Sequence, residues 1–359
     1  MKRLLTVIVV LILSLLSCQQ VFACTIFNME KNGEVLVGNN EDFFYTYSSE
    51  LWIAASGEDS YGRICFANSS YVQGGMNEKG LFYDGAMCPA SKIPYDESKP
   101  QLNMDMGEII LSKCGTVDEV IKFVEGYNIP QSYTDHLMFA DSSGACAVIE
   151  WMDDDMKIVK KEGSYQIATN FWLSDPKLGG YPCSRYEKAE EMLSGDRKDI
   201  SAGFFADILK ATAQDWGDGG TKYSNVYDLK RQEVVIYTKG DFNQYIKLNL
   251  QNELENLSGG EKTTYDIDQL FENEKLVQKT KLINDSIIKP DNTDSSSLLS
   301  KRTGDVRQEE RKAENETEEA EGSKDKGINW TIIWNTVIVL LILAILFYSL
   351  RRRADKKEE

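Results

Sequence analysis

Cys24 is the residue whose position most directly indicates chemistry. Lys2 and Arg3 are followed by an apolar run over residues 4–16 and by the small-residue site Val21-Phe22-Ala23. This pattern is typical of a secretory signal peptide, so residues 1–23 are expected to be removed. Cleavage makes Cys24 the first residue of the mature chain. An N-terminal cysteine carries a thiol nucleophile and, in its own α-amino group, a base with a pKa near ~8.

Three other interpretations of this N-terminus remain open. The apolar run can act as an uncleaved anchor, although it is short for spanning a bilayer. Leu15-Leu-Ser-Cys18 resembles a bacterial lipoprotein box, and lipidation at Cys18 leaves six residues in front of Cys24 and blocks its amine. Cys24 can also be a small buried residue at the head of a strand. Cleavage after Ala23 is the interpretation that gives the thiol a chemical role.

The single histidine limits the other kinds of chemistry. One imidazole cannot build a multi-histidine metal site, and the seven cysteines contain no CxxC pair, so we expect no metal and no cofactor. A Ser-His-Asp triad has to use His136, which lies in an apolar stretch and is expected to be structural. An N-terminal cysteine needs no histidine, because its own amine takes the thiol proton. The acidic run at 153–155 lacks the EF-hand pattern and is expected to be a solvated turn.

Composition excludes several classes of protein. The hydrophobic fraction of 42% is that of a globular chain, and the net charge of −17 argues against a nucleic-acid partner, because phosphate binding requires a basic face. The cysteines after the N-terminus form at most two disulfides or none, and their pairing is left open. They are Cys65, Cys88, Cys114, Cys146 and Cys183.

A second apolar run lies near the C-terminus. Residues 329–350 are expected to form one transmembrane helix, and the arginines at 351–353 favour the cytoplasmic side for the basic tail over 351–359. Residues 251–328 are polar with few aromatics and are expected to form a partly disordered stalk. We expect a single-pass membrane protein whose catalytic domain is extracytoplasmic. The oligomeric state is left open.

Residues 24–250 alternate apolar runs with Gly, Asn and Asp turns, as in a mixed α and β domain. Asn32-Gly33 between two apolar runs predicts a β-hairpin. Further hairpins are predicted over 136–151 and over 157–169. Capping-box patterns that begin at Thr116 and Ser184 predict two helices, and a third helix is predicted over 201–213. Two groups of strands with helices around them indicate sheets packed on each other.

Several blocks of this region occur in the order found in one enzyme family. They are Cys24-Thr-Ile-Phe27, Gly38-Asn-Asn-Glu-Asp42, Gly75-Met-Asn-Glu-Lys-Gly-Leu81, Ala168-Thr-Asn170 and Cys183-Ser-Arg185-Tyr186. Together they resemble the N-terminal nucleophile hydrolases of the choloylglycine hydrolase and penicillin V acylase family, which cleave linear amides. Relatives of that family include acyltransferases that act on isopenicillin N. The resemblance covers roughly residues 24–250.

The resemblance implies a fold and a set of site residues. The fold is the α+β, four-layer αββα sandwich. Cys24 attacks the amide carbonyl, and Asp42 holds the amine against the sulfur. Asn170 donates to the oxyanion of the tetrahedral intermediate. Arg185 keeps the thiolate and the amine polarised.

Two positions depart from the family pattern. Asn39 replaces the motif arginine beside the nucleophile, so the substrate need not be the acidic conjugates that a second arginine can hold. The second oxyanion donor of the family, counted from Gly80, falls on Met87. A backbone donor survives that change of side chain. We therefore place Asn39 in substrate binding and Met87 as a backbone oxyanion donor.

The sequence predicts a cysteine amidohydrolase acting on a small acyl-amide through a thioester acyl-enzyme. Two alternatives remain. The acyl group can pass to an amine acceptor instead of water, which makes the protein an acyltransferase. The chain can also be a catalytically silent surface-binding module that keeps only the fold.

Overall fold

The computed structural model describes residues 24–69, 71–103, 105–272 and 278–279. The expected signal peptide, transmembrane helix and basic tail lie outside the described residues, as does most of the expected stalk. Within the described ranges, no helix combines the length and the apolar character needed to cross a membrane.

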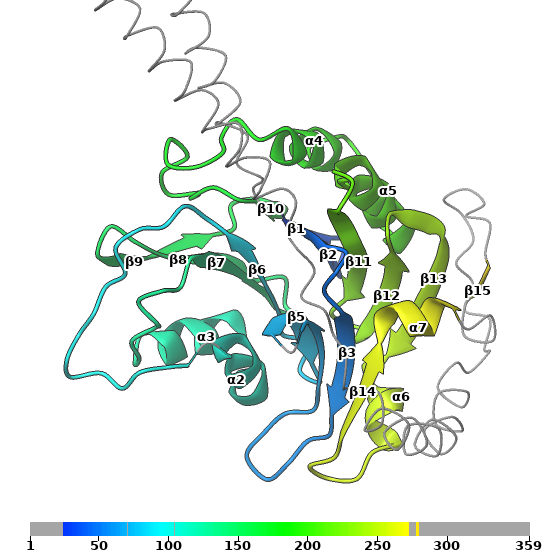
Figure 1. Ribbon diagram of the computed structural model, residues 1–359, viewed down its shortest axis with the longest axis horizontal. Coiled ribbons are helices and arrows are strands. Elements are labelled where there is room, and N and C mark those ends of the chain that lie inside the picture. Colours follow the sequence, from blue (N-terminus) through cyan, green and yellow to red (C-terminus); the bar gives the residue numbers. More distant parts are fainter. Residues whose placement is uncertain (1–23, 70, 104, 273–277, 280–359) are drawn as a thin grey trace, which may run out of the picture. The chain divides into compact units, whose positions relative to one another are not determined.

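The described strands form two antiparallel sheets (Figure 1). The first sheet has seven strands in the order β10-β1-β2-β11-β12-β13-β15. Its strands are β1 (Thr25–Lys31), β2 (Glu34–Phe44), β10 (Tyr165–Ala168), β11 (Gly219–Asp228), β12 (Glu233–Thr238), β13 (Asp241–Asn249) and β15 (Gln278–Lys279). Asn32 and Gly33 connect β1 to β2 with φ values of 52° and 81°. These left-handed conformations confirm the predicted tight hairpin.

The second sheet has eight strands in the order β14-β3-β4-β5-β6-β7-β8-β9. They are β3 (Ser49–Ala54), β4 (Arg63–Asn68), β5 (Tyr71–Asn77), β6 (Phe82–Met87), β7 (Asp135–Ala140), β8 (Cys146–Met152), β9 (Asp155–Lys160) and β14 (Lys262–Asp266). The predicted hairpin over 136–151 is confirmed as β7 and β8. The one over 157–169 is wrong, because β9 pairs with β8 whereas β10 pairs with β1 in the other sheet.

Helices cover the outer faces of the two sheets, which gives the four layers expected of an αββα sandwich (Figure 1). Helices α4 (Ser184–Leu193) and α5 (Ala202–Thr212) pack on the first sheet, and α2 (Met106–Lys113) and α3 (Val117–Val124) pack on the second. Each interface has its own apolar cluster, and a further cluster fills the space between the sheets. Burial of these apolar surfaces stabilises the stack of layers.

Capping residues fix the starts of α3 and α5. Thr116 accepts a hydrogen bond from the backbone N–H of Glu119, which confirms the predicted cap. Ser201 accepts one from Phe204 and begins the helix predicted over 201–213. The helix at 184–193 also forms, but its N-cap is Cys183 and not Ser184, and Cys183 makes no side-chain capping bond. The start of α4 is therefore set by its surroundings, and Arg185 in its first turn is buried.

The folded domain continues past the expected boundary at residue 250. Helix α6 (Leu250–Glu255) and helix α7 (Ile267–Glu272) supply Leu250, Ile267 and Leu270 to the core between the sheets. Strand β14 pairs with β3 and forms the edge of the second sheet. Residues 251–272 thus belong to the domain, because they complete both a sheet and the core that the sheets share.

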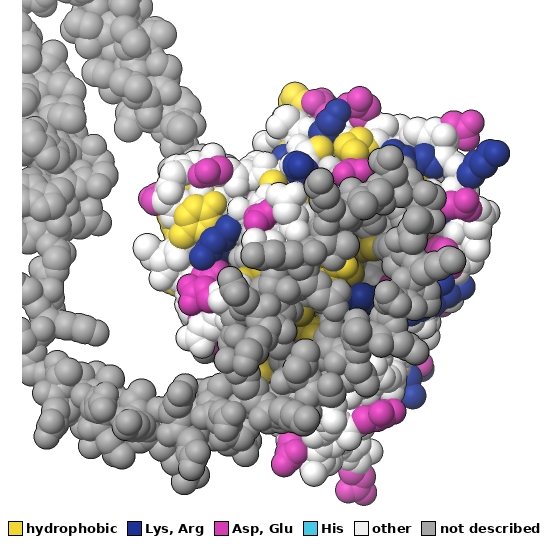
Figure 2. All heavy atoms as spheres, turned by 90° about the vertical axis from the view of Figure 1, so that its right-hand side faces the viewer, with side chains coloured by type: hydrophobic (Ala, Val, Ile, Leu, Met, Phe, Trp, Pro, Cys, Tyr) yellow, Lys and Arg dark blue, Asp and Glu magenta, His cyan; other side chains and the backbone are white. Residues whose placement is uncertain are grey.

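Two further expectations concern the thiols and the charge. The six cysteines in the described part of the chain are all free, which selects the alternative without disulfides for them. Among the described side chains visible in Figure 2, acidic and basic groups are interspersed.

Candidate active site

Cys24 lies immediately before β1, at the end of an inner strand that is flanked by β2 and β10. Its side chain is buried and belongs to the core between the two sheets. The Sγ atom lies 3.6 Å from Oε2 of Glu41. The nucleophile predicted from the sequence therefore faces a carboxyl group on the neighbouring strand.

Arg185 reaches the nucleophile from helix α4. Its Nη1 atom donates to the backbone carbonyl of Cys24 at 2.6 Å and to Oγ1 of Thr25 at 2.8 Å. Its Nη2 atom donates to Oδ1 of Asn170 at 3.0 Å. The predicted proximity of Arg185 and Cys24 holds, but these bonds engage the backbone of Cys24 and not its sulfur. Arg185 thus orients the residue and its neighbours.

Asn170 connects the end of β10 to the end of β6. Its Nδ2 atom donates to the backbone carbonyl of Met87 at 2.8 Å, while its Oδ1 atom accepts from Arg185. The Nδ2 atom of a primary amide carries two N–H donors, so the same nitrogen can serve two acceptors. The two residues predicted as oxyanion donors, Asn170 and Met87, are therefore brought together. Their donation to an oxyanion stays a prediction.

Asp42 lies on β2 and is fully buried. Its Oδ1 atom accepts a hydrogen bond of 2.5 Å from Oγ1 of Thr221, whereas Oδ2 is buried and has no hydrogen-bond partner within the described residues. In the chain as described, Cys24 still follows Ala23 through a peptide bond. A free α-amino group at Cys24 is the donor that the sequence analysis assigns to this carboxylate.

Glu41 is a site residue that the sequence analysis missed. It is buried, and its Oε1 atom accepts a hydrogen bond of 2.7 Å from Nδ2 of Asn68. Asn68 in turn accepts a bond of 3.0 Å from Ser49 Oγ. The signal was available: residues at alternate positions of a strand share a face, and Glu41 lies two positions after Asn39, which the sequence analysis had placed in substrate binding.

Burial and negative charge determine the protonation of this group of residues. Burial raises the pKa of the Cys24 thiol well above its usual value, and the nearby carboxyl groups, Glu41 first, add to the effect. Burial also raises the pKa of Glu41 to about 8, with a further contribution from Asp42. Burial raises the pKa of Asp42 to about 7, against the opposing effects of Thr221 and Arg185. These shifts refer to the chain before cleavage, in which Cys24 has no free amine. The expected effect of Arg185 on the thiolate and the amine concerns the chain that begins at Cys24, and it stays a prediction.

Asn39 lies on β2, two positions before Glu41, and therefore faces the other sheet. It is fully buried, and neither its Oδ1 nor its Nδ2 atom has a partner within the described residues. Asp84, on β6 of the facing sheet, is also buried, and its Oδ1 atom has no hydrogen-bond partner among the described residues. The space between the sheets is thus polar at the Cys24 end. Asn39 lies in this interior, so its predicted contact with substrate stays a prediction.

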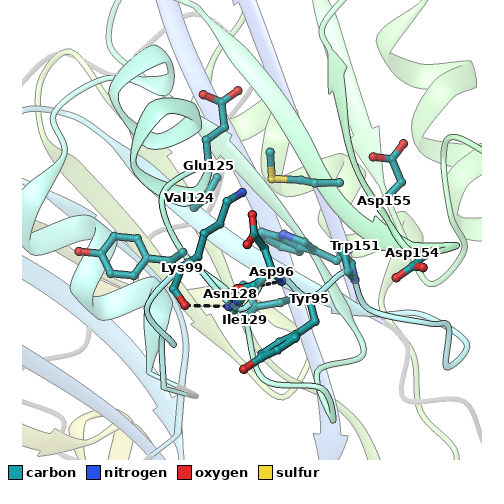
Figure 3. A pocket seen from close by; sticks show the side chains of 13 residues that line it. Tyr95, Asp96, Lys99, Val124, Glu125, Asn128, Ile129, Trp151, Asp154 and Asp155 are labelled. Atoms are coloured by element: carbon teal, nitrogen blue, oxygen red, sulfur yellow. Dashed lines mark hydrogen bonds between the residues drawn. The ribbon is translucent and has the colours of Figure 1, made fainter.

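A separate pocket of about 350 Å³ lies away from these residues. It is formed by the segment around Tyr95 to Lys99, the end of α3, and strands β8 and β9, and Trp151 lies within it (Figure 3). The acidic residues Asp96, Asp154 and Asp155 line it together with Lys99. None of the predicted site residues is among its lining residues, and no cluster of metal-ligating side chains is found in the described ranges.

Comparisons with known proteins place this geometry in context. Residues 28–177 match the family model described as acyl-coenzyme A:6-aminopenicillanic acid acyl-transferase. This range includes Asp42, Met87 and Asn170, whereas Cys24 and Arg185 lie on either side of it. A search of curated protein sequences gave no match.

Solved structures share the fold over nearly their whole length. An arginine-to-leucine variant of conjugated bile acid hydrolase from Clostridium perfringens has 20% sequence identity and a TM-score of 0.55, with 74% of this chain and 100% of that chain covered. Penicillin V acylase from Agrobacterium tumefaciens has 18% identity and a TM-score of 0.58, with 72% and 98% covered. A cysteine-to-alanine mutant of the same bile acid hydrolase has 20% sequence identity and a TM-score of 0.54, with 74% of this chain and 100% of that chain covered. The resemblance indicated by the motifs is thereby confirmed: residues 28–177 match the acyl-transferase family model, and the chain has the fold of the bile acid hydrolase and the penicillin V acylase.

Proposed function

We propose that the protein hydrolyses a linear, non-peptide amide through a thioester on Cys24, after removal of residues 1–23. One observation carries the proposal. Arg185 donates both to the backbone of Cys24 and to Asn170, so a single side chain joins three residues from three separate sequence blocks. A fold kept for binding alone has no need of this convergence on the backbone of a residue whose thiol is buried. The substrate class that fits is a small acyl-amide.

The free α-amino group of Cys24 starts the reaction. In its neutral form it takes the thiol proton as Sγ bonds to the amide carbonyl carbon. The buried Oδ2 atom of Asp42 is the available acceptor that would hold this amine in place. Because the thiol pKa is raised by its surroundings, the proton must be removed as attack occurs.

The carbonyl oxygen becomes negatively charged in the tetrahedral intermediate. The side-chain amide of Asn170 and the backbone N–H of Met87 are the proposed donors, and Arg185 fixes the Asn170 amide through Oδ1. The C–N bond then breaks as the ammonium of Cys24 returns the proton to the leaving amine. A water molecule, deprotonated by the same amine, attacks the thioester and releases the acid and the thiol.

Acyl transfer is the second candidate, since the family model matched by residues 28–177 is described as an acyl-transferase. The first half of the reaction is the same in both cases. The two candidates differ in the second half, where an amine replaces water as the acceptor of the acyl group.

We also propose that the reaction takes place outside the cytoplasm, on a chain held to the membrane by residues 329–350. The signal-peptide pattern and the long apolar run followed by Arg351 support this location. The intact mass of the mature chain, purified from the membrane fraction, should equal that of a chain whose first residue is Cys24. A chain beginning at a lipidated Cys18 would contradict both the location and the mechanism.

The activity is tested with the full chain starting at Cys24 and a panel of acyl-amides, with products followed by mass spectrometry. Turnover is expected for at least one amide, together with a covalent acyl adduct on Cys24. Cys24→Ala should abolish both, while an exposed-site variant such as Lys188→Ala should leave both unchanged. Adding a primary amine separates the two candidates, because an acyltransferase forms the new amide in preference to the acid. Turnover that survives Cys24→Ala would reject the proposal.

A further inference from the structure

We infer that His136 and Glu150 are positioning residues that hold both segments of the oxyanion site in place. The two segments are residues 87–89, which contain Met87, and residues 170–174, which contain Asn170. The inference rests on the proposed function, because it concerns the oxyanion of that reaction. It gives the single histidine of the chain a role that differs from acid–base catalysis.

The two side chains form a buried pair on adjacent strands. His136 on β7 and Glu150 on β8 are both fully shielded from solvent, and His136 Nδ1 lies 3.0 Å from Glu150 Oε1. They point into the space between the two sheets, like Met138 and Val148, which lie two positions away on the same strands. A buried ion pair is costly to form and strongly destabilising to break, so its presence calls for a structural reason.

Glu150 fixes the segment that follows Asn170. Its Oε1 atom accepts a hydrogen bond of 2.6 Å from the backbone N–H of Leu173, and Oε2 accepts one of 3.0 Å from the backbone N–H of Ser174. One carboxylate thus binds two consecutive backbone groups and the imidazole. The position of the chain three residues after Asn170 is determined by this carboxylate.

Trp172 connects this segment to the other one. Its Nε1 atom donates to the backbone carbonyl of Pro89 at 3.2 Å, and its ring lies edge-on to His136 with centroids 6.2 Å apart. Cys88 packs in one cluster with Trp172. The pair therefore supports residues 87–89 and 170–174 together, and the bond from Asn170 to Met87 closes the arrangement.

Electrostatics favour the charged form of the pair. Burial opposes protonation of His136, but the adjacent Cys88 and Glu150 outweigh it and raise the pKa to about 10. Burial likewise opposes ionisation of Glu150, but its bonds with His136 and Ser174 hold the pKa below the usual value. Asp135 is the other titratable group that interacts with His136. Both shifts favour an imidazolium facing a carboxylate, which fits a positioning role for His136.

The test compares His136→Gln and Glu150→Gln with Glu108→Gln, which removes a charge from the ion pair of Glu108 with Arg63, on the α2 side of the second sheet. Each variant is prepared as the full chain starting at Cys24. The kcat of amide turnover should fall about 10- to 100-fold in the first two variants, since misplacing a catalytic group by about 1 Å costs up to ~10²-fold. The KM should change less than twofold, and Glu108→Gln should keep the wild-type kcat.

Alkylation of Cys24 by iodoacetamide separates positioning from damage to the nucleophile. This reaction uses the thiol but forms no oxyanion, so its rate should stay within twofold of wild type in all variants. Hydrogen exchange by mass spectrometry should show faster exchange of the peptide containing Leu173 and Ser174 in Glu150→Gln, but not in Glu108→Gln. A parallel loss of alkylation and turnover would overturn the inference.

The charge of the pair is measured separately in the variants that keep His136, because the only histidine gives a single imidazole signal in NMR of an untagged chain. In wild type and Glu108→Gln that signal should titrate well above pH 8, and in Glu150→Gln its pKa should fall. Equal kcat values in wild type, His136→Gln and Glu150→Gln would reject the role of the pair and leave the proposed function standing. Absence of amide turnover by wild type would reject the proposed function and, with it, the role of the pair.

Discussion

The two sides of Cys24 differ in how completely their polar groups are satisfied. On one side, Arg185 and Asn170 form a continuous set of hydrogen bonds that ends at Met87. On the other side, Glu41 faces the thiol, and buried oxygens of Asp42 and Asp84 have no partner within the described residues. The first side holds the two residues proposed as oxyanion donors, whereas the second has buried carboxyl groups and, in the part of the chain that the structure describes, no basic side chain bonded to them. A positive charge on that side is what an α-ammonium group on Cys24 would supply.

The largest effect is expected for a chain that keeps Val21-Phe22-Ala23 in front of Cys24. This chain has no free α-amine at Cys24, so no ammonium group can pair with the buried carboxyl groups and no amine can take the thiol proton. Amide turnover is expected to fall by about 10²–10⁴-fold, the usual contribution of a positioned base. The measurement is kcat/KM against the same chain starting at Cys24.

A protease site placed before Cys24 provides the control for that experiment. Cleavage that leaves Cys24 as the first residue should restore activity in the same sample. Equal rates before and after cleavage would show that the α-amine is not the base, and Glu41 would then be the nearest group able to take the thiol proton.

Arg185→Ala removes the side chain that links Cys24 to Asn170 by hydrogen bonds. It leaves the carbonyl of Cys24 and the amide of Asn170 without this donor, so kcat/KM is expected to fall about 10²–10³-fold, as for loss of an oxyanion donor. The free energy of unfolding should fall by about 3 kcal/mol, because hydrogen bonds from a buried charged group are lost. Activity assays and urea unfolding measure the two effects.

Arg231→Ala is the matched control, since Arg231 is exposed and pairs with Glu34 and Asp228 at the surface. The kcat/KM of Arg231→Ala should stay within twofold of the wild-type value. A similar loss in both variants would mean that Arg185 acts through general stability and has no special role at Cys24.

Glu41→Gln tests the side of Cys24 on which buried carboxyl groups lack partners, and it has the smallest expected effect of the three changes. The folded-state pKa of Glu41, about 8, lies above the usual value of a glutamate, so between pH ~4.5 and 8 the unfolded chain has lost a proton that the folded chain retains. Stability must therefore fall as pH rises through this window, by at most about 1.4 kcal/mol per pH unit for this proton. Urea unfolding at several pH values should show a shallower fall in Glu41→Gln than in the parent chain.

The comparison is sharpened by repeating that titration on two forms of the chain. The form that starts at Cys24 should already show a shallower slope than the extended form, because its ammonium group favours ionised Glu41 and Asp42. If the two forms have the same slope, the α-amine does not lie beside these carboxyl groups.

The sequence predicted the residues of the satisfied side and most of the fold. Cys24, Asn170 and Arg185 were predicted from short blocks that resemble those of one enzyme family, and Met87 was predicted by counting from Gly80. The structure brings these residues together, while their chemical roles stay predictions. Periodicity and the Asn32-Gly33 turn located the first hairpin, and capping-box patterns located two helices. These features depend on local spacing, which a sequence displays directly.

The residues that were missed depend on contacts between distant segments. Glu41 matters because β1 and β2 place it on the face of Cys24, and Glu150 matters because residues 173 and 174 return to β8. The local sign of Glu150 was a charged residue in the otherwise apolar strand β8, and the local sign of Glu41 was its alternation with Asn39 on β2. The separate sheets of β9 and β10 could not be inferred from their short connection, because connection length alone does not determine pairing.

Strand β14 has a practical consequence for handling this protein. A chain cut after Leu250 would lose the partner of β3 and bare a strand edge that carries Leu51, Trp52 and Ile53. Open edges with apolar side chains are templates for intermolecular pairing and aggregation. Shortened forms intended for crystallisation or assay should therefore extend at least through Glu272, and insolubility of a shorter form would reflect this bared edge and say nothing about the catalytic residues.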